Sequence, residues 1–123
     1  MLIRYIGMKI LICGSRNITD YERCVEYISK IIKTNALTPT VIIHGGARGA
    51  DTIANTFAIQ HRLPTLVFKP DWSTGKSAGY IRNGQMVEIA DAVIAIWDGQ
   101  SRGTNHTINL GIEKGVPTFV VNY

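Results

Sequence analysis

The sequence predicts an α/β protein: a single Rossmann-like three-layer α/β/α sandwich on a five-stranded parallel sheet, with the strand order 3-2-1-4-5. Short runs rich in β-branched residues alternate with helix-length amphipathic segments, and the connections between them are short. Right-handed crossovers between parallel strands then place helices on both faces of the sheet. The chain has 123 residues, 46% of them hydrophobic, which is enough for the core of one domain.

Each predicted element follows from local patterning. The predicted strands are the apolar runs at residues 8–13, 40–44, 64–68, 92–97 and 117–121. The predicted helices cover residues 20–33, 50–61, 77–90 and 103–114. Apolar residues share one face of the first two helices, as Ile53 and Phe57 do in the second. The last helix is expected to end at Gly115, a C-cap glycine that is followed by Pro117.

Residues 1–7 are predicted to form an N-terminal extension and residues 8–123 the domain itself, with Met8 as an alternative start. No apolar run approaches the roughly 20 residues of a membrane span, and the first residues lack a signal-peptide pattern, so a cytoplasmic location is expected. Cys13 and Cys24 fit neither a CxxC nor a zinc spacing and lie in apolar or periodic segments. We therefore expect buried, reduced thiols. We also expect no metal site and no cofactor.

The distribution of charge and motifs indicates where a ligand would bind. The chain has 13 Lys+Arg against 9 Asp+Glu, a net charge of +4, which favours anionic partners. Nearly every unusual motif follows a predicted strand, and in the predicted strand order the topological switch point lies between the first and fourth strands. The cationic residues that fall in these loops or in the helix behind them are Arg16, Arg48, Lys69, Lys76, Arg82 and Arg102.

Two glycine-rich loops, residues 45–49 and 99–104, are candidate phosphate-binding sites, because glycines allow close backbone approach and helix-start N–H groups bind anions. Plain tight turns are the alternative interpretation. Trp72 and Trp97 lie near strand ends, where an indole either stacks on a base or packs under a loop. The candidate ligand-binding residues are Gly14, Ser15, Arg16, His44, Gly45, Gly46, Arg48, Gly49, Asp51, Trp72, Lys76, Asn83, Trp97, Gly99, Ser101, Gly103 and Thr104.

Five ordered motifs carry a resemblance to a known family: the strand–GSR start, HGGARGAD, DW…GK…AG..RN..M, AD.VIA.WDG.S.GT and the final G.P strand. Over residues 8–123 the chain resembles the YspA/YpsA-type branch of the SLOG superfamily. The resemblance implies a Rossmann-like domain that binds a nucleotide or nucleotide-derived ligand, as a sensor, sequestering or processing domain. The same superfamily includes the Lonely-Guy phosphoribohydrolases and the DprA/Smf proteins.

The first functional hypothesis is a domain that binds a nucleotide-type small molecule at the carboxyl edge of the sheet, with Arg16, Arg48 and Arg82 near its phosphate. The alternative is an N-glycosidase or phosphoribohydrolase acting on a nucleoside 5′-monophosphate or an ADP-ribose-like compound. Residues 82–86, RNGQM, match the Lonely-Guy R-[KN]-xx-M motif, but Thr107 stands where the second motif of those enzymes has glutamate. Asp98 or Asp71 would then be the catalytic carboxylate beside Arg82.

Single-stranded DNA binding, as in the DprA/Smf relatives, ranks lowest among the hypotheses. The basic residues are expected to converge on a pocket rather than to form a stripe interleaved with aromatic residues. Self-association is expected as well, because the resemblance extends to the Lonely-Guy homo-oligomers.

Overall fold

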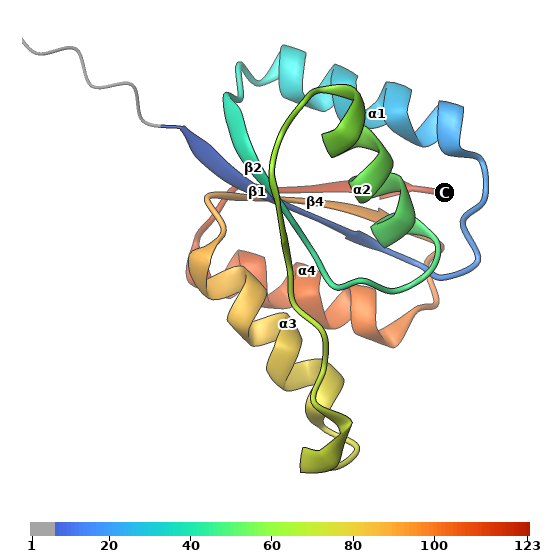
Figure 1. Cartoon of the computed structure of the whole chain (residues 1–123), viewed down its shortest axis with the longest axis vertical. Helices are drawn as coiled ribbons and strands as arrows, with labels where there is room; N and C mark the ends of the chain where they lie inside the picture. Colours follow the sequence, from blue (N-terminus) through green and yellow to red (C-terminus); the bar gives the residue numbers. More distant parts are fainter. Residues whose placement is uncertain (1–6) are drawn as a thin grey trace, which may run out of the picture.

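The fold is the predicted one. The computed structural model describes residues 7–123 and contains a parallel five-stranded sheet in the order β3-β2-β1-β4-β5, flanked by helices on both faces (Figure 1). The strands are β1 (Met8–Gly14), β2 (Pro39–His44), β3 (Thr65–Val67), β4 (Ala92–Trp97) and β5 (Thr118–Asn122). The helices are α1 (Tyr21–Thr34), α2 (Ala50–Gln60), α3 (Ala78–Ile89) and α4 (Arg102–Lys114). Of the predicted N-terminal extension, residues 1–6 lie outside the described residues.

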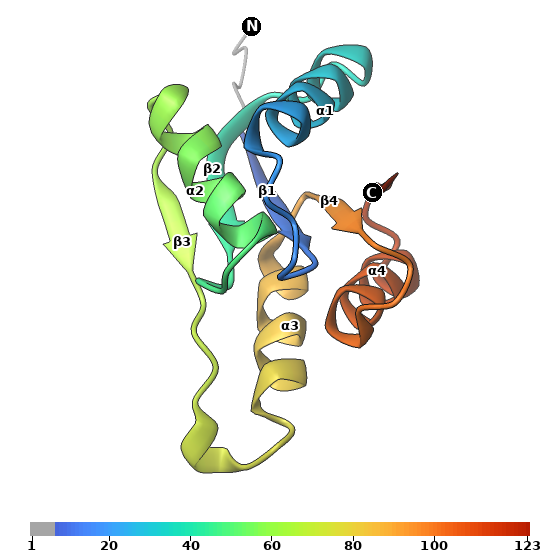
Figure 2. The ribbon, with the colours of Figure 1, turned by 90° about the vertical axis from the view of Figure 1, so that its right-hand side faces the viewer.

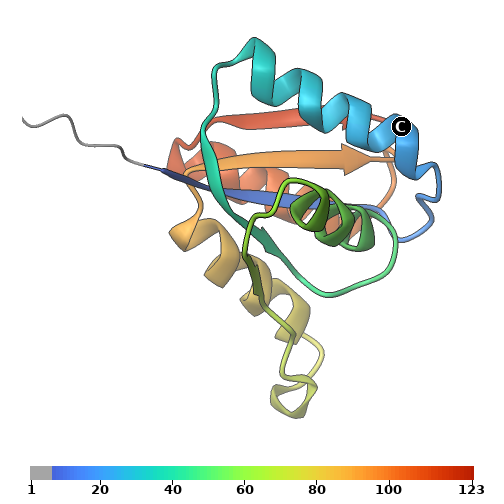
Figure 3. The ribbon, with the colours of Figure 1, turned by 45° about the horizontal axis from the view of Figure 1, so that its top comes forward.

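The sheet separates two hydrophobic layers. Helices α1 and α2 cover one face and α3 and α4 the other; in Figure 3, α2 lies in front of the strands and α4 behind them. The α1/α2 layer buries Ile28 and Phe57, whereas the α3/α4 layer buries Met86 and Val87. The two cysteines are buried, free thiols, as predicted, and they belong to different layers: Cys24 to the first and Cys13 to the second.

Local sequence explains where the helices begin and end. The carboxylate of Asp20 caps α1 by accepting a hydrogen bond from the N–H of Arg23, 3.2 Å away. Ser101 caps α4 in the same way, through Thr104. Helix α4 ends at Gly115, as predicted, in the left-handed conformation with φ 79°. No helix in residues 7–123 has both the length and the apolar character needed to span a bilayer.

The segment between β3 and α3 departs most from the sequence expectations. A strand was expected over residues 64–68, but β3 covers only Thr65–Val67 at the edge of the sheet. Leu66 and Val67 are exposed there, because β3 has one neighbour strand and little helix packing. The chain then extends away from the sheet to a short 3-10 helix, η1 (Trp72–Thr74), before it returns into α3 (Figure 2).

The connections at the carboxyl edge pack against one another. Gly49, at the start of α2, has φ 75°, and a Cβ atom at this position would collide with the carbonyl of Ser15 in the β1–α1 connection. The Ala50 N–H donates to the same carbonyl oxygen at 3.4 Å. The HGGARGAD motif therefore lets the connections after β1 and β2 pack closely at the switch point.

Candidate functional site

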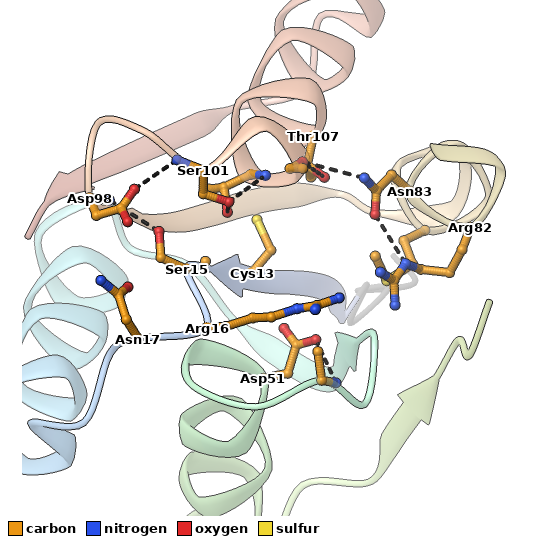
Figure 4. Close-up of a pocket in the computed structure, with 15 residues that line it drawn as sticks. Cys13, Ser15, Arg16, Asn17, Asp51, Arg82, Asn83, Asp98, Ser101 and Thr107 are labelled. Atoms are coloured by element: carbon orange, nitrogen blue, oxygen red, sulfur yellow. Dashed lines mark hydrogen bonds between the residues drawn. The ribbon is translucent and has the colours of Figure 1, made fainter. Parts of the chain in front are cut away.

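A cavity of about 390 Å³ opens at the carboxyl ends of β1 and β4, the predicted switch point (Figure 4). Its walls come from the connections after β1, β2 and β4 and from the two helices α3 and α4. The predicted ligand-binding residues that line it are Gly14, Ser15, Arg16, Asp51, Asn83, Ser101, Gly103 and Thr104, and two of the three predicted catalytic residues, Arg82 and Asp98, line it as well. The cavity therefore lies where the predicted strand order places the topological switch point.

Arg82 reaches from α3 across the edge of the sheet. Its Nη1 atom donates hydrogen bonds to the carbonyl oxygens of Gly45, at 2.8 Å, and Phe68, at 3.2 Å. Its Nε atom donates to Oδ1 of Asn83 at 3.0 Å, and the Asn83 amide nitrogen donates to the Gly103 carbonyl at 3.3 Å. Helix α3 is thus bonded to the connection after β2, to the residue after β3 and to the first turn of α4.

Arg16 provides a second guanidinium in the same cavity. Its side chain is exposed and extends across the opening toward Arg82 and Asp51 (Figure 4). In residues 7–123 the one ion pair is Lys114–Glu88, so neither arginine has a carboxylate within ion-pairing distance. Burial lowers the pKa of Arg82, the nearby charge of Asp51 opposes that shift, and the charge of Arg16 adds to it. Two guanidiniums that form no ion pair in residues 7–123 can bind an anion between them, although the Asp51 carboxyl lies nearby.

Asp51 is an acidic group of the same cavity, beside the end of Arg16 (Figure 4). It is 7% exposed, and its Oδ2 atom accepts a hydrogen bond from the N–H of Ala47 at 3.0 Å. Burial raises the pKa of this carboxyl, while the Ala47 N–H and the charges of His44 and Arg82 partly offset the rise. The sequence left open whether Asp51 only stabilises the start of α2. The structure places its carboxyl in the cavity wall.

The two aspartates proposed as catalytic carboxylates differ in position. Asp98 lines the cavity, but its Oδ1 atom accepts N–H groups of Gln100 and Ser101 at 2.9 and 2.8 Å, and these bonds hold the pKa of Asp98 below its usual range. Asp71 lines neither this cavity nor the smaller cavity next to it. Its carboxylate caps η1 by accepting a hydrogen bond from the N–H of Ser73. Both carboxylates therefore shape local backbone. The N-glycosidase hypothesis stays a prediction.

Backbone amides of the loop at residues 45–49 and of Ala50 form hydrogen bonds within the protein. The Gly46 N–H donates to Nδ1 of His44 at 3.1 Å, the Ala47 N–H donates to Asp51, and the Ala50 N–H donates to Ser15. These amides are engaged inside the fold. Side chains, above all the two guanidiniums, therefore carry the positive charge that faces the cavity.

A second, smaller cavity of about 190 Å³ adjoins the first. The two share Arg16, Arg82, Asn83 and Gly103, and the second adds Trp72, Lys76, Gly79 and Tyr80. The predicted ligand-binding residues that line neither cavity are His44, Gly45, Gly46, Arg48, Gly49, Trp97 and Gly99. The indole of Trp97 is directed elsewhere, because its Nε1 atom donates to the Ser101 carbonyl at 3.0 Å.

Several lining residues were not predicted from the sequence. They are Cys13, Asn17, Met86 and Thr107 in the larger cavity and Gly79 and Tyr80 in the smaller one; Ala47, which also lines the larger cavity, belongs to the predicted loop at residues 45–49. Asn17 directly follows the predicted Gly14-Ser15-Arg16 run, and its position after a strand was an available signal. Met86 and Tyr80 lie on α3, and their direction depends on how that helix packs against the sheet.

The fold and cavity define a Rossmann-like domain with a polar site, lined by two arginines and two aspartates, at the topological switch point. A family model described as "YspA, cpYpsA-related SLOG family" matches residues 8–75, and the Gene 61 protein of Mycobacterium phage D29 is 34% identical over 122 residues, 94% of this chain and 95% of that protein. The chain belongs to the YspA, cpYpsA-related SLOG family.

Two solved structures share the fold. The X-ray structure of DNA processing protein A (DprA) from Streptococcus pneumoniae has a TM-score of 0.69 at 20% identity, covering 93% of this chain and 50% of that one. DNA processing protein A from Helicobacter pylori, in a structure titled for its unique single-stranded DNA binding mode, has a TM-score of 0.65 at 23% identity, covering 93% and 65%. The chain thus spans about half to two thirds of these proteins.

These neighbours correct the partner prediction. A nucleotide-type small molecule was expected, and nucleic acid was considered unlikely, whereas a neighbour of this fold is titled for binding single-stranded DNA. The expectation that the basic residues are not interleaved with aromatic residues is also wrong. Aromatic side chains do interleave with basic ones at the edge of the site, because Trp72 and Tyr80 line the same cavity as Arg16, Lys76 and Arg82.

Proposed function

We propose that this chain binds single-stranded nucleic acid at the carboxyl edge of its sheet, with a backbone phosphate against Arg16 and Arg82. The observation that carries the proposal is the pair of guanidiniums that face one open cavity, neither of which forms an ion pair among the described residues. Arginine forms charge-assisted hydrogen bonds with phosphate oxygens, and such contacts supply most of the affinity for a nucleic acid backbone.

The rest of the cavity suits a nucleotide unit. Hydroxyls of Ser15, Ser101, Thr104 and Thr107 line it and can bond sugar or base groups. The carboxylate of Asp51 repels a second phosphate. Its oxygens can instead accept hydrogen bonds from the amino and imino groups of a base. A phosphate bound to the guanidiniums and a base or sugar group bound to the Asp51 carboxylate would use both kinds of charge in the cavity.

In this proposal the two adjoining cavities together form one open groove, which is lined by three cationic side chains. Lys76 adds positive charge there, and the two cavities share Arg16 and Arg82. A strand can continue through such a groove, since single-stranded binders combine a cationic path with exposed aromatic rings. The phage relative and the DprA neighbours support the family and the fold, and the side chains of this cavity support the choice of ligand.

The experiment is a fluorescence anisotropy titration of a labelled 12-nucleotide single strand, dT12, with the purified protein. Arg16→Ala should weaken binding about 5- to 100-fold, because a charge-assisted contact is lost. Lys33→Ala is the matched control: it also removes one exposed positive charge, but in the last turn of α1, and lines neither cavity. Absence of dT12 binding by the wild-type protein, or equal losses in both variants, would reject the proposal.

A further inference from the structure

The residues that line the second cavity include exposed aromatic rings, which a phosphate site at Arg16 and Arg82 does not need. Trp72 and Tyr80 are among the exposed large hydrophobic residues of the described chain, at 60% and 48%, and both line it. Exposed aromatic rings that gather in one cavity usually mark a contact site. This pair comes from two different elements, η1 and α3, so the protruding segment after β3 brings Trp72 to the site.

The two rings are supported from behind. The Trp72 indole packs near Gly79, where an added Cβ would lie 3.6 Å from Cη2 of the indole. The Tyr80 ring rests against the imidazole of His106, with ring centroids 4.5 Å apart and an interplanar angle of 41°. The His106 Nδ1 atom lies 3.3 Å from the amide nitrogen of Asn83, so the aromatic group is linked to the residue that holds Arg82.

The charges that line the second cavity indicate which kind of ligand fits it. Lys76, Arg16 and Arg82 line the cavity, and no acidic residue does. A purely apolar protein surface would bury these cations without partners, at a cost in desolvation. A nucleobase has a π-face for the rings, and its attached phosphates pair with the cations.

We propose that the second cavity is a base-stacking subsite in which a nucleobase of the bound single strand stacks on the indole of Trp72. This inference rests on the proposed function and extends it: the four shared residues make the two cavities continuous, so the site takes consecutive nucleotides of one strand. A phosphate lies on the arginines, and the base of an adjoining nucleotide lies on the indole. Stacking of this kind tolerates any base sequence.

The test separates bases from phosphates. Binding of dT8 is compared with binding of an abasic 8-mer that has the same number of phosphates but tetrahydrofuran in place of each base. The wild-type protein should bind dT8 about 5- to 100-fold more tightly than the abasic strand. Trp72→Ala should remove most of that difference by weakening dT8 alone, and Trp72→Phe, which keeps an aromatic ring, should retain it.

Intrinsic fluorescence gives an independent readout. The chain contains two tryptophans, and Trp72 is the exposed one, so dT8 should quench the emission of the wild-type protein but not that of Trp72→Phe. The abasic strand should quench neither. Tyr21→Ala is the matched control, an aromatic residue that is 44% exposed but lines neither cavity.

The outcomes distinguish the two proposals. If dT8 and the abasic strand bind equally and Trp72→Ala changes neither, the stacking subsite is wrong and the phosphate site stands. If Trp72→Ala weakens both strands equally, the indole acts on the shape of the site and the stacking subsite is again wrong. If the wild-type protein binds neither strand, both proposals fail.

Discussion

The Nη1 atom of Arg82 donates a hydrogen bond to the carbonyl oxygen of Gly45 across 2.8 Å, which connects α3 to a loop 37 residues earlier in the chain. The same atom bonds Phe68, and the adjacent Nε bonds Asn83. One side chain therefore joins three segments while its guanidinium still faces the cavity. Arg82 is a structural as well as a candidate binding residue, and tests of function must separate the two roles.

Arg82→Lys should lower the free energy of unfolding by about 1 to 3 kcal/mol. A lysine ammonium lacks the planar fork of the guanidinium, so it cannot satisfy the carbonyls of Gly45 and Phe68 and the Asn83 amide together. Urea denaturation followed by circular dichroism measures the loss. Arg48→Lys, the same change at an exposed arginine that lines neither cavity, should leave stability nearly unchanged.

The pH dependence of stability should reveal the Asp51 carboxyl. Burial raises its pKa in the folded protein, so the folded state holds the proton more tightly than the unfolded chain does. Its contribution to stability is therefore largest at low pH and is lost as the pH rises from about 4, the ordinary aspartate value, through the raised value. Asp51→Asn keeps an oxygen for the Ala47 N–H and should gain stability relative to the wild type over this window.

The measurement for Asp51 is the midpoint of urea unfolding for the two proteins at closely spaced pH values between 3 and 8. Glu26→Gln, the same loss of a carboxylate on an exposed part of α1, is the control. A difference between wild type and Asp51→Asn that stays constant with pH would show that Asp51 keeps an ordinary pKa in the folded protein.

Two glycine substitutions should act in opposite directions. Gly49→Ala places a Cβ against the Ser15 carbonyl at a φ of 75°, so it should be strongly destabilising, by at least about 2 kcal/mol. Gly84→Ala adds a methyl group inside α3 where no atom lies within 4 Å, so it should stabilise the protein by about 0.5 to 1 kcal/mol. Thermal unfolding checks both, and a stable Gly49→Ala protein would contradict the close packing of the loops.

The salt dependence of single-strand binding should measure the number of phosphate contacts. The logarithm of the binding constant for a single strand falls with the logarithm of salt concentration, with a slope of about −0.7 per phosphate neutralised. Arg16→Ala should make that slope shallower by about 0.7, whereas Trp72→Ala should leave it unchanged because stacking releases few ions. Anisotropy titrations of dT12 between 50 and 300 mM NaCl measure it. An unchanged slope for Arg16→Ala would place the phosphate elsewhere.

Periodicity and strand order were enough to predict most of the fold. All five strands and all four helices lie within about two residues of their expected bounds, because the apolar pattern of each element is visible in the sequence. The edge strand β3 is shorter than expected. Apolar residues such as Leu66 and Phe68 favour a strand there, but pairing to β2 alone supports only Thr65–Val67.

The candidate site was predicted in location and only partly in detail. Of the three arginines expected near a phosphate, Arg16 and Arg82 line the cavity and Arg48 does not. The sequence could not distinguish Asp98 from Asp71, since both follow strands, whereas the structure shows that only the first lines the cavity. Trp97 and Tyr80 show the same limit, because the direction of a side chain depends on neighbours that are distant in the sequence.

The cavity walls are contributed by residues from Cys13 to Thr107. During synthesis, a chain that has emerged only through β3 would hold Arg16 and Asp51 but neither Arg82 nor the α4 hydroxyls. A ribosome-bound fragment would therefore have half a site with no opposite wall. Under the proposed function, ligand binding should therefore begin only after α4 has emerged and packed.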